Sequence, residues 1–342
     1  MSTPRRARRF MLPALLLAPA GLGALMVFAN CDDGGSGGSG STSSSTGSSL
    51  ATTSSSSSGT GGGGVCDAPA ATTVGIHDGT FADGAKVHLE GVTAMSQKFL
   101  RRRGNDGSCL WAFFVSSPNI SVTTERSGIL VESLGDPAEP GDAGPAFCKP
   151  LGLQPTGGAI PDDVAPGDVV DIRGVVSASA PTGCAGDTTV THAVLVDASC
   201  PIVKSGVAGI PQAHILSATD VARLSDPLEG AFHEKWEGVK IAMSNEAPVL
   251  VPGGTQVDIQ YGVFRLVNGA VGVDSRIYYR GHLTSQPCHD GAAWATSPGF
   301  SFLHVEGFSQ RVECEWLVEP NDKCGDISPP SDDCAGQTCP GG

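Results

Sequence analysis

From Asp83 onward, short runs of alternating hydrophobic and polar residues recur between turns rich in Gly, Pro and Asp. Val87 and Leu89, for example, fall on one face of an extended chain, with His88 and Glu90 on the other. A period of two is typical of half-buried antiparallel strands, and no long run shows a helical period. The pattern predicts a first group of five strands at Lys86–Ala94, Ser108–Ser116, Gly128–Glu132, Asp168–Ser177 and Thr188–Val196.

A second group of five strands follows by the same criteria. Between the two groups, Thr219–Leu224 has room for one or two turns of helix. Together the patterns predict an all-β protein. The strands of the second group are expected at Trp236–Met243, Gln256–Val267, Val271–Tyr279, Phe302–Phe308 and Cys314–Val318.

A weak internal repeat links the two groups. Four tetrapeptides share the order apolar–charged–Gly–apolar, one in the first and one in the fourth strand of each group. Glycine weakens a strand, so its recurrence indicates a bulge or a sharp bend at each site. The four are Leu89-Glu90-Gly91-Val92, Ile172-Arg173-Gly174-Val175, Trp236-Glu237-Gly238-Val239 and Val305-Glu306-Gly307-Phe308.

Bent, glycine-bearing first and fourth strands in a group of five resemble an OB-fold barrel. The runs Val87–Val92, Trp111–Val115, Gly128–Val131 and Pro166–Val175 are similar to the OB-fold-like modules of bacterial extracellular nucleases, and Tyr261–Phe264 is similar to part of the module that follows them. The resemblance covers Asp83–Ile327. It implies two tandem small OB-like barrels, over 66–212 and 213–327. A short tail containing Pro and Cys, 328–342, follows in place of a catalytic domain, so the resemblance implies the non-catalytic part alone.

The N-terminus predicts export. Met1–Arg9 carries four arginines and no acid, and Phe10–Ala29 is almost wholly apolar. This order is typical of a secretory signal peptide, here over 1–30, and a retained transmembrane anchor is the alternative. Cys31 follows the apolar run directly and resembles the lipidated cysteine of bacterial lipoproteins, although Asn30 departs from that pattern. A stretch of Gly, Ser and Thr then continues the segment 31–65, a composition typical of a flexible tether.

Cysteine number also favours an exported chain. Of 11 cysteines, ten remain once Cys31 is set aside, and an even set in an exported protein indicates a disulfide framework. Cys184 with Cys200 and Cys334 with Cys339 are plausible pairs because each closes a modest loop. The ten are Cys66, Cys109, Cys148, Cys184, Cys200, Cys288, Cys314, Cys324, Cys334 and Cys339.

Net charge argues against nucleic acid as the partner. The chain carries 21 basic and 35 acidic residues, a net charge of −14. Removal of residues 1–30 takes away four arginines and no acid, which leaves 17 basic against 35 acidic residues, or −18. Proteins that bind nucleic acid normally draw much of their affinity from Lys and Arg on phosphates.

One basic cluster stands out against this acidic background. Lys98, Arg101, Arg102 and Arg103 fall in the predicted loop between the first two strands, which rims the ligand face of an OB-fold. These residues form a candidate site for an anionic group such as a phosphate, a sulfate or an acidic glycan. The alternative is a solvated loop paired with nearby acids. Trp111 on the second strand is either an exposed stacking platform or a core residue.

The sequence contains no nucleophile elbow, no His-Glu-x-x-His and no phosphate-binding glycine loop, and it predicts no catalytic residue, metal or cofactor. Three functional classes remain. The favoured one is a non-catalytic binding lipoprotein, anchored to the membrane at the cell envelope, with a glycan, peptide or protein as ligand. The alternatives are a nucleic-acid-binding accessory module and an unrecognised extracellular hydrolase.

Overall fold

The structure is a computed structural model in which strands predominate. The expectation of a mainly β protein is therefore confirmed. In the part of the chain that the structure describes, three short helices accompany the strands: α1 (Thr73–His77), α2 (Ala218–Leu224) and α3 (Gly230–Trp236). All described residues belong to one compact unit that begins at Thr60. The described residues are 66–103, 107–137, 139–141, 144–149, 151–152, 154–179, 193–224, 226, 229–243, 249–250, 263–266, 271–274, 301–302, 304–312, 315–321 and 325–328.

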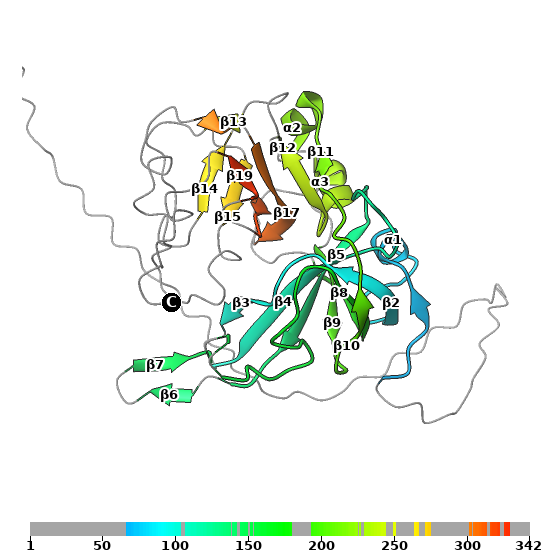
Figure 1. Cartoon of the computed structure of the whole chain (residues 1–342), viewed down its shortest axis with the longest axis vertical. Coiled ribbons are helices and arrows are strands. Elements are labelled where there is room, and N and C mark those ends of the chain that lie inside the picture. Colours follow the sequence, from blue (N-terminus) through cyan, green and yellow to red (C-terminus); the bar gives the residue numbers. More distant parts are fainter. Residues whose placement is uncertain are drawn as a thin grey trace, which may run out of the picture. The chain divides into compact units, whose positions relative to one another are not determined.

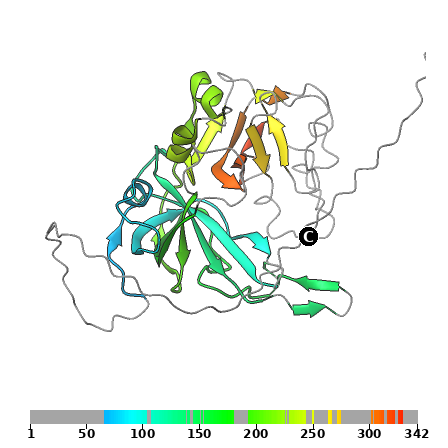
Figure 2. The same cartoon turned by 180° about the vertical axis from the view of Figure 1, so that it is seen from behind.

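The first sheet closes on itself. Its strands run in the order β1-β2-β4-β5-β9-β8-β10, β3 pairs with β4, and β2 pairs with β8 as well as with β4, so that β2, β4, β5, β9 and β8 form a ring (Figures 1 and 2). All pairs in the ring are antiparallel except β5 with β9, which is parallel. The bounds are β1 Ala70–Ala71, β2 Lys86–Ala94, β3 Phe99–Arg103, β4 Cys109–Ser116, β5 Gly128–Leu134, β8 Asp168–Ser179, β9 Ala193–Ala198 and β10 Val203–Val207.

Alternation along these strands fills the ring with apolar side chains. Val87 and Leu89 of β2 are fully buried in one core cluster, as are Trp111, Phe113 and Val115 of β4. Successive side chains of a strand point to opposite faces, so every second residue contributes to this interior. The predicted face of β2 is therefore confirmed, and Trp111 is a core residue with 1% of its surface exposed.

The second sheet has the order β11-β12-β17-β18-β15-β14, with β19 paired to β17. The pairs β12–β17, β17–β18 and β14–β15 are antiparallel, whereas β15–β18 is parallel. Among the described residues β12 does not pair with β14, so no closed ring is seen there. The bounds are β11 His214–Ile215, β12 Lys240–Met243, β14 Val263–Leu266, β15 Val271–Asp274, β17 His304–Val312, β18 Glu315–Glu319 and β19 Ile327–Ser328. Two small sheets pair β6 (Glu139–Gly141) with β7 (Gly144–Phe147), and β13 (Val249–Leu250) with β16 (Ser301–Phe302).

The expected strand Trp236–Met243 is wrong at its start. Trp236 ends helix α3, Gly238 lies in the following turn with φ of 71°, and strand β12 begins at Lys240. Phe232 and Trp236 are buried at a spacing of four, a helical period that a seven-residue helix is too short to display clearly. The expected helix at Thr219–Leu224 is confirmed as α2.

Two disulfides join described cysteines. Cys66 pairs with Cys200 across 134 residues of sequence, and Cys109 pairs with Cys148 across 39. The first pair corrects the expected partnership of Cys200 with Cys184, because strand pairing brings the start of the described chain beside the end of β9. The other cysteines lie outside the described residues, and so do the signal peptide and the tether: Cys31, Cys184, Cys288, Cys314, Cys324, Cys334 and Cys339.

Candidate functional site

The predicted basic loop is a strand in the structure. Phe99–Arg103 forms β3, which pairs with β4 and has a bulge between Leu100 and Arg102. The basic residues therefore do not act as one surface cluster, because neighbouring positions of a strand face opposite ways. Each of them has a different environment.

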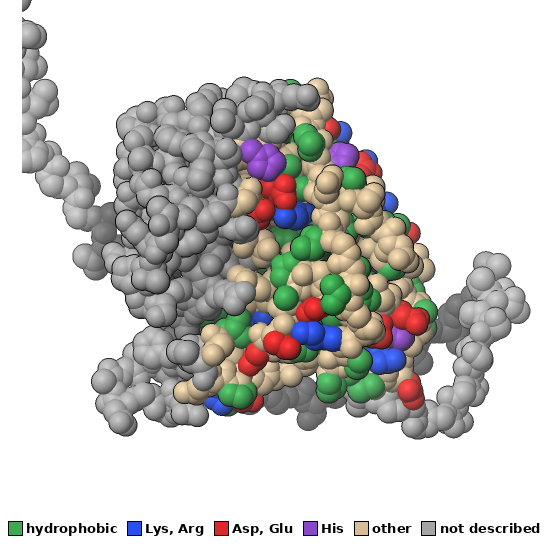
Figure 3. Space-filling model, in the orientation of Figure 1, with side chains coloured by type: hydrophobic (Ala, Val, Ile, Leu, Met, Phe, Trp, Pro, Cys, Tyr) green, Lys and Arg blue, Asp and Glu red, His purple; other side chains and the backbone are tan. Residues whose placement is uncertain are grey.

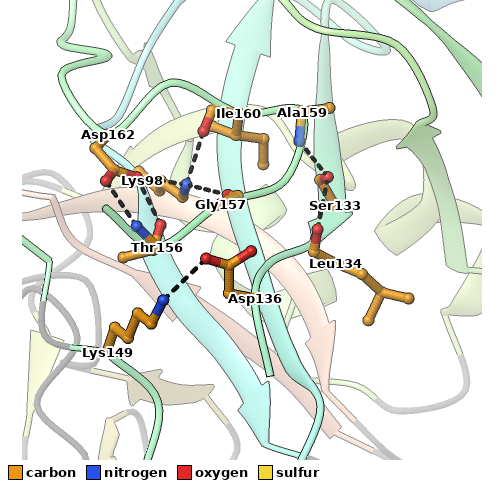
Figure 4. Close-up of polar contacts among 10 residues, drawn as sticks. All are labelled: Lys98, Ser133, Leu134, Asp136, Lys149, Thr156, Gly157, Ala159, Ile160 and Asp162. Carbon is orange, nitrogen blue, oxygen red and sulfur yellow. Dashed lines mark hydrogen bonds and ion pairs between the residues drawn. The ribbon is translucent and has the colours of Figure 1, made fainter. Parts of the chain in front are cut away.

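Lys98 is fully buried and ties a later segment of the chain to the first sheet (Figure 4). Its ammonium group donates to the carbonyl oxygens of Ile160 at 2.7 Å and Gly157 at 3.2 Å, and it forms an ion pair of 2.8 Å with Asp162 Oδ1. Lys98 Nζ also lies 5.3 Å from the centre of the Trp111 ring, a cation–π distance. The contacts satisfy the three ammonium donors, so Lys98 is not available to an external anion.

Asp162 organises the other end of this contact. It accepts hydrogen bonds from the backbone N–H of Thr156 at 2.9 Å and from the Thr156 hydroxyl at 2.5 Å (Figure 4). Burial would raise the pKa of the Asp162 carboxyl, but the hydrogen bonds from Lys98 and Thr156 outweigh burial and lower the pKa. Burial lowers the pKa of Lys98, and Asp162 opposes that change. The segment 156–162 is thus held by an ion pair between the buried Lys98 and Asp162, whose side chain is 31% exposed.

Arg101 also has partners within the chain. Its Nε lies 2.5 Å from Glu132 Oε1 on β5, and 20% of its side chain is exposed. Burial raises the pKa of Glu132, while the charges of Arg101 and Arg102 oppose that rise. Arg102 is exposed, and the side chain of Arg103 lies outside the described residues. Figure 3 shows a face on which the described Lys and Arg side chains lie beside Asp and Glu, a mixed charge pattern that would not attract a polyanion.

A pocket of about 470 Å³ lies between α1, the end of β8 and α3. Its described lining combines apolar side chains with four carboxylates and includes no Lys or Arg. The carboxylates come from the turn after α1 and from the end of α3. The lining residues are Ile76, His77, Asp78, Gly79, Phe81, Ala82, Asp83, Val176, Ala178, Glu234 and Glu237.

His77 is a neutral group in this pocket. Its Nε2 lies 2.8 Å from the carbonyl oxygen of Gly128, so Nε2 carries the proton and donates. Burial is the main cause that lowers the pKa of His77 to about 4; the hydrogen bond to Gly128 opposes the change and the charge of Arg126 adds to it. Asp83 accepts from the Ala178 N–H at 2.9 Å, which fixes one wall. The pocket therefore offers mainly acceptors.

A second charged cluster supports the second sheet. Lys240 of β12 forms ion pairs with Glu306 of β17 and, at 3.3 Å, with Asp326, while His304 Nε2 lies 3.3 Å from Glu306. Burial would lower the pKa of Lys240, but the charges of Asp326 and Glu306 raise it. Because the charges compensate one another across neighbouring strands, we interpret this cluster as structural.

No group of three His, Cys, Asp or Glu side chains in the described part of the chain has a geometry that would hold a metal ion. No helix in that part is both long and apolar enough to cross a bilayer. A comparison of the chain with known protein families, curated proteins and solved structures found no match in any of the three.

The pocket residues were not predicted from the sequence. The lining comes from three separate segments, 76–83, 176–178 and 234–237, that no spacing connects, and α1 and α3 are too short to show amphipathic periodicity. Of the predicted ligand site, Lys98 and Trp111 are buried whereas Arg102 is exposed, so these three side chains do not share one surface.

Proposed function

We propose that this protein is a non-catalytic binding lipoprotein, tethered to the bacterial cell envelope through Cys31. The observation that carries the proposal is the order of its segments: a basic start, an apolar run, Cys31, a Gly/Ser/Thr stretch and then a disulfide-bonded β unit. Disulfides persist in oxidising compartments, which agrees with export. A long flexible tether suits a module that must reach a ligand away from the membrane.

The two sheets are proposed to be OB-type barrels in tandem. In support, the ring of the first sheet is formed by β2, β4, β5, β9 and β8. Counted along the chain, these are the first, second, third, fifth and fourth strands of the ring, and the third and fifth are parallel. Counted along the chain, β12, β14, β15, β17 and β18 are the first to fifth strands of the second sheet. Their order in the sheet, β12-β17-β18-β15-β14, is then first, fourth, fifth, third and second, which is the order of the first sheet read in the opposite direction. The third and fifth strands are again parallel. Barrels of this type act mainly as binding modules, and the chemistry of their ligands differs widely.

The ligand is proposed to be an organic cation with an apolar part, such as a basic side chain of a peptide. The support is the pocket lined by His77, which offers an acceptor, by apolar Ile76 and Phe81, and by the exposed carboxylates Asp78 and Asp83. Acceptors beside an apolar wall favour a donor-bearing, positively charged group over an anion.

Anchoring is tested with the full chain expressed in a bacterial host. The wild type should incorporate radiolabelled palmitate and should partition into the detergent phase. The Cys31→Ser variant should neither incorporate palmitate nor partition into detergent. Ser36→Ala in the tether is the matched control. Membrane retention of Cys31→Ser with an uncleaved N-terminus would instead establish a transmembrane anchor, and wild-type protein free of lipid would contradict the proposal.

Ligand class is tested by calorimetry with tripeptides that pair Leu with Lys, Arg or Glu. We expect binding of the basic peptides, and loss of binding in the variant that combines Asp78→Asn with Asp83→Asn. Glu90→Gln is the control, because Glu90 is an exposed carboxylate of β2 that does not line the pocket. Equal binding of the acidic and basic tripeptides would count against the pocket.

A further inference from the structure

The outer face of β4 and β5 forms a second apolar core. Ala112 and Phe114 of β4 and Leu130 of β5 point away from the ring interior, yet they are at most 3% exposed. They belong to a cluster in which one member, Phe308, comes from β17 of the second sheet. The full cluster is Met95, Phe99, Ala112, Phe114, Leu130 and Phe308.

Phe308 covers the aromatic surface at the centre of this face. Its ring lies parallel to that of Phe114, with centroids 4.2 Å apart and an interplanar angle of 6°. Phe114 also stacks with Phe99, at 5.8 Å. Phe308 is fully buried, so the second sheet contributes a complete aromatic side chain to the face of the first.

Polar groups close the edge of the same contact. Gln310 lies two residues beyond Phe308 on β17 and therefore on the same face. With its amide oriented so that the oxygen faces Arg101, Gln310 accepts hydrogen bonds from Arg101 Nη1 and, at 3.1 Å, from Arg101 Nη2. Its amide nitrogen donates to Glu319 Oε2 at 2.9 Å. Arg101 in turn pairs with Glu132 of β5. A network of hydrogen bonds and ion pairs that spans the two sheets favours one alignment of them.

We infer that β17 is the permanent occupant of the outer face of β4 and β5, and that the two sheets consequently unfold as one cooperative unit. This is the face on which OB-type barrels take ligands, and a Phe on it is the type of residue on which a base or another ring stacks. Here Phe308 supplies that ring from within the chain. The inference is independent of the anchor and of the ligand proposed above.

Hydrogen exchange measured by mass spectrometry on the full mature chain tests the coupling. Phe308→Ala should raise exchange by about tenfold or more in β4 and β5 as well as in β17. Ile215→Ala is the control, because Ile215 of β11 is 59% exposed and lies outside the cluster, so it should leave exchange in both sheets unchanged. Phe232→Ala, at a buried position of α3 outside the cluster, should raise exchange in β4 and β5 as well, because one cooperative unit loses stability as a whole. Unchanged exchange of β4 and β5 in Phe308→Ala would overturn the inference.

A milder pair of variants keeps the test valid if Phe308→Ala fails to fold. Phe114→Leu and Phe308→Leu preserve volume approximately, and their effects on the denaturation midpoint should be non-additive in the double variant. Additive effects would contradict direct coupling. A labelled single-stranded dT oligonucleotide should not slow the exchange of β4 and β5 in the wild type, and such protection would show that the face is open to an external ligand.

Discussion

At the scale of single residues, the charges of the first sheet differ in how far water reaches them. Lys98 is fully buried with carbonyl partners and Asp162, whereas Lys204 forms ion pairs of 3.0 Å with Asp163 and Asp168 while 32% of its side chain remains exposed. An exposed ion pair contributes little to the free energy of unfolding. Removing the partner of a buried charged group destabilises a protein much more, because the remaining group is left unpaired.

Lys98→Ala should therefore lower the free energy of unfolding by about 2–4 kcal/mol, because it leaves the Ile160 carbonyl and Asp162 without their donor. Lys204→Ala should cost about 1 kcal/mol or less. Chemical denaturation of the two variants measures the difference. Similar losses in both would mean that the buried ammonium group is not important for the segment 156–162.

His77 predicts a dependence of stability on pH. The unfolded chain binds this proton near pH 6.5, whereas the folded protein holds the imidazole neutral until its pKa of about 4. The neutral His77 therefore contributes fully to the free energy of unfolding above pH 6.5. This contribution, on the order of 3 kcal/mol, is lost as the pH falls to 4.

Thermal melts between pH 7 and pH 4 check this prediction against His77→Gln, which retains a side-chain donor for Gly128. The wild type should lose more stability over that interval than the variant does. Burial also lowers the pKa of His233, but that histidine is common to both proteins and cancels in the comparison. Parallel curves would refute the assignment to His77.

At the scale of elements, glycine is required at two positions of the repeated tetrapeptide, Gly91 and Gly174, for different reasons. Gly91 has φ of 64° and lies at a bulge where the register of β2 against β8 shifts. Gly174 has no such φ, but a Cβ there would run into the Asp197 carbonyl of β9. The first position requires a conformation, and the second requires close approach of two backbones.

Gly91→Ala should cost about 1–2 kcal/mol, since space is open around its Cβ position and the penalty is conformational. Gly174→Ala should cost more, because β9 has to move away from β8. Denaturation midpoints of the two variants rank these penalties, and a larger loss at Gly91 would contradict the distinction.

Elements with clear alternation could be predicted, and elements held by distant partners could not. β2 matches its predicted bounds, because Val87 and Leu89 alternate with polar residues on a half-buried strand. The sequence predicts a loop at β3 because its arginines favour solvent. In the structure Arg101 instead forms an ion pair with Glu132 and hydrogen bonds with Gln310, which lies far along the chain. No local pattern in a sequence predicts a hydrogen-bond partner that lies so far along the chain.

At the scale of the whole molecule, the disulfides close loops of very different length. In the chain-entropy model, the loop of 134 residues closed by Cys66–Cys200 is worth about 5 kcal/mol, and the loop of 39 residues closed by Cys109–Cys148 about 4 kcal/mol.

Removal of the first pair with Cys66→Ser and Cys200→Ser should therefore destabilise the protein somewhat more than Cys109→Ser with Cys148→Ser. Unfolding in denaturant under oxidising conditions provides the measurement. Because serine at the buried Cys109, Cys148 and Cys200 positions adds a desolvation cost, the corresponding Ala variants of both pairs are the control. A negligible effect of the first pair would show that other contacts already restrain the N-terminal segment.

The Cys66–Cys200 bond also determines how the molecule bears tension. If drag on a bound ligand pulls against the proposed membrane anchor, the force enters the folded part at Cys66. The next attachment along the chain is β1, two residues paired in parallel with β2, which would separate under a small load. The disulfide instead passes the load covalently to Cys200, between β9 and β10. Reduction would therefore lower the force at which this end of the molecule yields.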